Sequence, residues 1–136
     1  MEKVNLLLVE DNDTDAHLAL RIFKKEVKNH SFKWLPDGKQ VLDYFAQIKE
    51  HEMPDLVLLD LKIPKVSGME VLKHIKSNKQ TSKLPVIIYS SSAQVSDREK
   101  AYAFGANSFL TKPNDYKEMK EVLGTAYKYW IKFNQK

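Results

Sequence analysis

One apolar run, which ends on an aspartate and breaks at a proline, constrains the fold of this chain more than any other feature. It reads Pro54-Asp55-Leu56-Val57-Leu58-Leu59-Asp60-Leu61-Lys62-Ile63-Pro64. A run of Leu and Val without polar alternation predicts a strand buried on both faces, as in the middle of a parallel sheet. Asp60 would then lie at the strand's carboxyl end, where open α/β sheets form their binding crevice. Taken alone, Asp60 could equally be a residue that opens the turn before Pro64.

A second apolar run, Val4–Val9, stops on Glu10 and Asp11. If both runs are parallel neighbours, Glu10, Asp11 and Asp60 converge at one edge of the sheet, where their charges repel unless a cation lies between them. Oxygen ligands without His or Cys indicate a hard ion, and so few protein ligands favour Mg²⁺ that keeps several waters over a caged Ca²⁺. Alternatively, acids here complement the dipole of the following helix, and for Asp13 we prefer that interpretation, as a cap.

Length and composition limit the class of protein. With 136 residues the chain is expected to be a single domain over 1–136 without an output domain. The absence of cysteine excludes a disulfide framework and thiolate metal sites. The charged start lacks the apolar segment of a signal peptide, and the apolar runs are too short for a membrane span. A soluble cytoplasmic protein, not associated with a membrane, is therefore expected.

The net charge of the chain does not indicate a nucleic-acid-binding protein. The formal charge is +4 and the pI is near 9.1, a balance that could suggest a nucleic-acid partner. The lysines are, however, spread along the helical segments and interleaved with acids, as on a solvated helix face. Binding to DNA or RNA is therefore not expected.

Strand and helix patterns alternate along the chain. The predicted strands are 4–9, 31–35, 55–60, 84–89 and 107–111, and helical spacing covers 13–28, 41–48, 71–78, 96–104 and 116–133. This alternation predicts a three-layer, doubly wound (βα)5 fold of the α/β class with a parallel sheet, because right-handed crossovers place helices on both faces. The element lengths suit the flavodoxin-like strand order 2-1-3-4-5, in which the first and third strands are neighbours.

Motifs at the strand ends resemble those of the response-regulator receiver domain. They are Val9-Glu10-Asp11-Asn12, then Leu58-Leu59-Asp60 with Pro64 and Gly68, a hydroxyl after the fourth strand, and Lys112-Pro113 after the fifth. Together and in this order they are highly specific, and the resemblance covers the whole chain. The chain is also similar to stand-alone regulators associated with phytochrome-type sensor kinases, through Asp11-Asn12-Asp13, Ile63-Pro64-Lys65 and an aromatic last helix.

The resemblance implies a phosphoacceptor and a metal site. Asp60 would accept a phosphoryl group in a two-component phosphorelay, from a sensor histidine kinase or a phosphotransfer protein. Glu10, Asp11, Asp60 and the backbone carbonyl of Lys62 would hold Mg²⁺. A carboxylate can attack phosphorus only when the donor's charge is screened and the transferring group is held in line. Such a chain is a signalling protein that catalyses only its own phosphorylation and dephosphorylation.

The resemblance also implies residues that bind phosphate and switch the surface. Lys112 and the hydroxyls of Ser90 and Ser91 would bind the phosphoryl oxygens, and a cis bond before Pro113 would aim Lys112 inward. Ser90 and Phe109 would form the switch that remodels the face made by the fourth helix, fifth strand and fifth helix. Alternatively, Lys112 is a surface lysine before a turn, Ser90 caps the backbone, and Phe109 belongs to the core.

The implied output is binding to a partner, which includes a second copy of the chain. On the last helix, Tyr127, Tyr129 and Phe133 fall partly outside the stripe that a single domain needs to bury. They predict a homodimer through the switching face; the alternative is that they cover the edge of the domain.

Two other functions remain open from the sequence. The first is a Mg²⁺-dependent aspartyl phosphatase of the haloacid dehalogenase type, although its general acid, two residues after the nucleophile, is replaced here by Lys62. The second is a degenerate receiver that binds partners without phosphorylation. A phosphorylation assay separates it from a working receiver.

Overall fold

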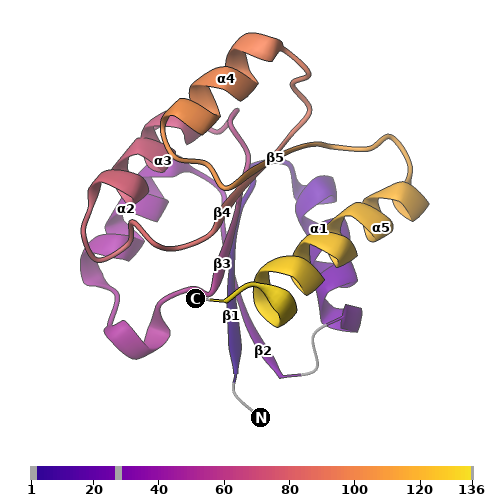
Figure 1. Cartoon of the computed structure of the whole chain (residues 1–136), viewed down its shortest axis with the longest axis horizontal. Helices are drawn as coiled ribbons and strands as arrows, with labels where there is room; N and C mark the ends of the chain where they lie inside the picture. The colour runs from indigo at the N-terminus through magenta and orange to yellow at the C-terminus, as the bar shows by residue number, and fades with distance from the viewer. Residues whose placement is uncertain (1–2, 27–28, 136) are drawn as a thin grey trace.

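The computed structural model describes residues 3–26 and 29–135, which form a parallel sheet between two layers of helices (Figure 1). The strands lie in the order β2-β1-β3-β4-β5. In chain order the elements are β1 (Val4–Val9), α1 (Asp13–Glu26), β2 (His30–Leu35), α2 (Gly38–Gln47), the 3-10 turn η1 (Glu50–Glu52), β3 (Leu56–Leu59), α3 (Gly68–Ser77), β4 (Val86–Ser90), α4 (Val95–Ala103), β5 (Ser108–Thr111), α5 (Tyr116–Tyr127) and the π-helical turn η2 (Lys128–Phe133). The predicted fold class and strand order are confirmed.

The core has two halves, one on each face of the sheet. Helices α2, α3 and α4 cover one face, and α1 and α5 cover the other (Figure 1). Successive residues of a strand point to opposite faces, so Leu7 and Val9 of β1 enter the first half while Leu6 and Leu8 enter the second. Both faces are buried, which explains why the central strands show no polar alternation.

Two helices begin at residues that the apolar spacing did not identify. Helix α2 begins at Gly38, where the Asp37 side chain accepts the Gln40 N–H at 2.8 Å, and α3 begins at Gly68, where Ser67 has the same role. The prediction that Asp13 caps α1 was wrong. The Asn12 side chain accepts the N–H of Asp15 at 2.9 Å, and Asp13 lies in the first turn.

The last predicted helix is two structures in succession. Helix α5 ends at Tyr127, and the chain continues as the wider turn η2, where the N–H of Asn134 donates to the carbonyl of Tyr129 at 2.7 Å. Trp130 and Ile131 pack against the α1/α5 half of the core, whereas Tyr129 and Phe133 are 52% and 68% exposed. The predicted end of α1 at residues 27–28 lies outside the described residues.

Within the described part of the chain, every helix is too short or too polar to span a bilayer.

Candidate functional site

Glu10 and Asp60 meet because β1 and β3 are hydrogen-bonded neighbours. Val9 pairs with Leu59, and the N–H of Asp60 donates to the carbonyl of Val9 at 3.0 Å, so the strands end at the same level. Both acidic side chains are buried. The predicted convergence at the carboxyl edge of the sheet is therefore present.

Asp11 joins these two residues at the mouth of the site. Carboxylate oxygens of Glu10, Asp11 and Asp60 all lie within 4.8 Å of one another. Asp11 is exposed, so an ion held by this trio would keep access to solvent. A set made only of carboxylate oxygens suits a hard divalent cation such as Mg²⁺ or Mn²⁺.

The ammonium of Lys112 lies at the centre of the acidic residues. Its Nζ contacts Glu10 Oε1 at 2.7 Å, Asp15 Oδ2 at 2.9 Å and Asp60 Oδ2 at 2.9 Å, and the side chain is only 10% exposed. Burial alone would lower the pKa of Lys112, but these hydrogen bonds raise it overall. The lysine therefore stays charged and neutralises part of the buried acidic cluster.

Glu10 is the most strongly perturbed carboxyl of the site. Burial raises its pKa to about 7, with the charge of Asp60 adding to the rise and the hydrogen bond with Lys112 opposing it. Its other oxygen accepts the N–H of Asn12 at 3.2 Å, and its backbone carbonyl accepts the indole N–H of Trp34 at 2.8 Å. A cation next to Glu10 would favour its charged form, which fits a role as a metal ligand.

Both oxygens of Asp60 are oriented by hydrogen bonds. Oδ1 accepts the backbone N–H of Lys62 at 3.2 Å, and Oδ2 accepts Lys112 Nζ at 2.9 Å. These two donors, from the ends of β3 and β5, thus fix the orientation of the carboxylate plane. The side chain of Lys62 is exposed at this edge.

The other predicted site residues lie on β4 and β5. Ser90 is fully buried, and its hydroxyl accepts the N–H of Ser92 at 3.3 Å, whereas Ser91 is exposed. Phe109 is half-buried against the α2/α3/α4 half of the core. The tertiary structure brings Ser90 to the carboxyl end of β4, next to β3, whereas Phe109 lies near the start of β5 and Ser91 turns to solvent.

The cis bond before Pro113 that the resemblance made a candidate is not present, because the Lys112–Pro113 peptide is trans. Lys112 nevertheless points inward. Its N–H donates to the carbonyl of Ser90 at 2.8 Å, which extends the pairing of β4 and β5 one residue beyond Thr111. The side chain of Lys112 is aimed into the crevice by this register, without a cis bond.

Two residues of the site were missed from the sequence. Asp15 contacts Lys112 from the first turn of α1, and Trp34 on β2 holds the carbonyl of Glu10. The sequence could have indicated Asp15 only through its spacing, because it follows Asp11 by about one helical turn. For Trp34 the sequence showed a strand residue and nothing more.

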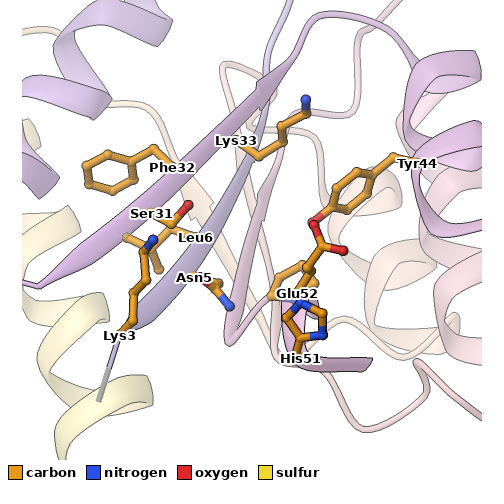
Figure 2. A pocket seen from close by; sticks show the side chains of 10 residues that line it. Lys3, Asn5, Leu6, Ser31, Phe32, Lys33, Tyr44, His51 and Glu52 are labelled. Atoms are coloured by element: carbon orange, nitrogen blue, oxygen red, sulfur yellow. The ribbon is translucent and has the colours of Figure 1, made fainter. Parts of the chain in front are cut away.

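A pocket of about 390 Å³ lies at the opposite, amino-terminal ends of β1 and β2 (Figure 2). In this view the hydroxyl of Tyr44 and the carboxylate of Glu52 point toward each other (Figure 2). Burial and the charge of Glu52 raise the pKa of Tyr44. None of the site residues described above lines this pocket, so we do not assign the phosphoryl chemistry to it.

Comparison with known proteins agrees with this geometry. The family described as response regulator receiver domain matches residues 6–124. The probable methanogenesis regulatory protein FilR2 of Methanothrix harundinacea is 37% identical over 135 residues, which cover 96% of this chain and 85% of that protein.

Solved structures of response regulators share the fold over nearly the whole chain. The phosphorylated cyanobacterial phytochrome response regulator RcpA superposes with a TM-score of 0.92 at 28% identity, covering 98% of both chains. The Mn²⁺-bound form of response regulator Rcp1 superposes with a TM-score of 0.88 at 30% identity, covering 97% of both chains. The resemblance to phytochrome-associated regulators is therefore confirmed, and the chain belongs to the receiver-domain family of two-component response regulators.

Proposed function

We propose that this receiver accepts a phosphoryl group on Asp60, with Mg²⁺ held by Glu10, Asp11, Asp60 and the backbone carbonyl of Lys62. The observation that carries the proposal is the pairing of one oriented, buried carboxylate with a buried ammonium 2.9 Å away and a cluster of metal-binding oxygens beside it. The phosphoryl donor is a sensor histidine kinase or a phosphotransfer protein, the partners of this family.

In the proposed step, a carboxylate oxygen of Asp60 attacks the phosphorus of a phosphohistidine. A phosphorus–oxygen bond forms, the phosphorus–nitrogen bond breaks, and the imidazole leaves with its electron pair and takes up a proton. When bound, Mg²⁺ supplies charge screening for the phosphoryl oxygens. Lys112 donates to one phosphoryl oxygen, and the hydroxyls of Ser90 and Ser91 are available to donate to another.

The signal would leave the site through β4 and β5. Turning of the Ser90 hydroxyl from the Ser92 N–H to a phosphoryl oxygen would vacate space that the half-buried ring of Phe109 can fill. The backbone N–H of Phe109 donates to the hydroxyl of Tyr102 on α4 at 3.1 Å. A movement of Phe109 would therefore shift α4 through this hydrogen bond. The face made by α4, β5 and α5 is thereby remodelled.

A homodimer through this face is part of the proposal. A groove of about 470 Å³ lies between β5, α5 and η2, and its lining includes Leu110, Tyr129 and Trp130. Tyr129 and Phe133 of η2 are exposed to solvent. Sedimentation of unmodified and beryllofluoride-bound protein tests it. We expect tighter dimerisation with beryllofluoride; a monomer in both states, or a dimer unaffected by Tyr129→Ser with Phe133→Ser, would exclude this interface.

The phosphoacceptor is tested with acetyl phosphate and Mg²⁺. We expect mass spectrometry to locate the phosphoryl group on Asp60, and we expect Asp60→Asn protein to stay unmodified. A phosphoryl group on another residue, or modification that persists after Mg²⁺ is chelated, would contradict the proposal. Complete absence of modification would instead favour a receiver that binds partners without phosphorylation.

The phosphatase alternative is not favoured. The position two residues after Asp60, where the general acid of a haloacid-dehalogenase-type enzyme lies, holds the basic residue Lys62. The activity proposed here is limited to the receiver's own phosphorylation and dephosphorylation, in the cytoplasm, where the kinase domains of two-component systems act.

A further inference from the structure

Lys112 contacts one carboxylate that does not belong to the metal-binding trio. Of its three acidic partners, Glu10 and Asp60 have oxygens in the cluster suited to a cation, and Asp15 does not. An ammonium has three N–H donors. In the structure, contacts with the three carboxylates match these donors in number.

This balance changes when the trio holds a divalent cation. Glu10 and Asp60 would then also serve the ion, and the ion's charge would repel the ammonium. Asp15 is the remaining acidic partner among those that Lys112 contacts in the described structure. Without it, a side chain that is 10% exposed would have to keep its charge beside a cation with no carboxylate of its own, or turn toward solvent.

The position of Asp15 is set independently of the metal site. It lies in the first turn of α1, where its own N–H is capped by the side chain of Asn12 at 2.9 Å. The next residue, Ala16, is fully buried in the core between α1, α5 and the sheet. The Lys112 ammonium that Asp15 contacts also lies over the ring of Tyr89, with 5.9 Å between Nζ and the ring centroid. Asp15 therefore presents its carboxylate to Lys112 from a rigid element.

We propose that Asp15 is a positioning residue for the phosphoryl-transfer reaction, because it holds the Lys112 ammonium beside Asp60 while Glu10 and Asp60 bind the metal. This inference rests on the proposed function. Asp15 does not touch the reacting atoms; it acts through Lys112, which donates to the phosphoryl group. At 29% exposure, its side chain reaches solvent at one edge, so replacing it leaves the core intact.

Acetyl phosphate tests the inference without a partner protein. In that reaction an oxygen of Asp60 attacks phosphorus, the bond from phosphorus to the acetyl oxygen breaks, and acetate leaves with the electron pair. We expect the rate at saturating Mg²⁺ to fall roughly tenfold in Asp15→Asn protein, which equals about 1.4 kcal/mol of barrier. Saturation matters because loss of one negative charge also weakens Mg²⁺ binding, and excess Mg²⁺ removes that contribution.

The matched control is Asp13→Asn. Asp13 also lies in the first turn of α1, so it shares the helix-dipole effect and the same charge change, but its exposed side chain is not among the contacts of Lys112. We expect its rate to stay within about twofold of wild type. If wild type is modified at Asp60 and both variants react equally fast, the inference alone is overturned. If wild type is not modified at all, the proposed function fails and the inference fails with it.

A second readout reports on Lys112 directly. In ¹⁵N-labelled protein with Mg²⁺ and beryllofluoride, the buried Lys112 ammonium should give an NMR signal in wild type and Asp13→Asn that is absent from Lys112→Arg. We expect this signal to be lost or broadened by solvent exchange in Asp15→Asn and to return in Asp15→Glu. An unchanged signal in Asp15→Asn would show that Asp15 does not hold the ammonium and would overturn the inference.

Discussion

The carboxyl edge of the sheet and the face made by α4, β5 and α5 are built in opposite ways. At the edge, Glu10 and Asp60 are buried, and contacts of 2.7–2.9 Å join them to Lys112, whose side chain is 10% exposed. On the face, α4 buries only Ala101, and none of the four residues of β5 is fully buried. Groups that we propose to perform the chemistry are tightly held, while groups that would report the result are loosely packed.

The difference assigns a thermodynamic role to each region. A paired, buried polar network has one low-energy arrangement, so its geometry is preorganised. Helix α4, with its thin apolar stripe, and the edge strand β5 need less free energy for local opening than the buried network does. They can therefore rearrange in response to a small change at the site. A hydrogen bond from the Phe109 N–H to the hydroxyl of Tyr102 joins β5 to α4, and Tyr102 is itself 48% exposed.

The largest effect is expected from breaking the buried network at Lys112. In Lys112→Met protein, three carboxylates lose their cation, which should destabilise the metal-free fold by about 3–5 kcal/mol. Urea unfolding measures this, and added Mg²⁺ should recover part of the loss by replacing the missing charge. The control, Lys117→Met on the exposed side of α5, should change stability by less than about 0.5 kcal/mol. Equal effects of the two substitutions would mean that the cluster is not held by Lys112.

A smaller effect is expected at the solvent side of the same edge. Asp60 is buried, and the exposed Lys62 side chain follows it by two residues, where it can lie across the approach of water. Lys62→Asn should therefore speed loss of the phosphoryl group several-fold, which is about 1 kcal/mol of barrier. The decay of phosphorylated protein after removal of the donor measures it, with Lys79→Asn as the distant control. An unaltered decay rate would show that Lys62 points away from the site.

The smallest effect is expected on the loosely packed face. Tyr102→Phe removes the hydroxyl that accepts the Phe109 N–H, and should destabilise the fold by only about 0.5–1 kcal/mol because the bond is partly exposed. Hydrogen exchange of the Phe109 amide should become several-fold faster, while exchange at Leu59 in the central strand should not change. A loss of stability as large as that of Lys112→Met would contradict the contrast between the two regions.

Much of the fold was predictable because its signals are local. The apolar runs of β1 and β3 carry the pattern of strands that are buried on both faces. Because these strands are parallel neighbours, the acid that directly follows each run reaches the same edge of the sheet. Glu10, Asp11 and Asp60 could therefore be placed together from the sequence. Boundaries were less predictable: α2 and α3 begin at glycines outside the apolar periodicity, and Asn12, rather than Asp13, caps α1.

The sequence by itself determined which segments form strands and which acids follow them, because both depend on patterns within a few residues. Only the tertiary structure decided how Lys112 is held. Its contact with Asp15 joins residues 97 apart, and its direction follows from the pairing of β4 with β5 through a trans peptide. The wider turn η2, whose Trp130 and Ile131 pack on the core, was likewise not indicated by the sequence. Such contacts depend on how distant elements meet in space, which local periodicity does not specify.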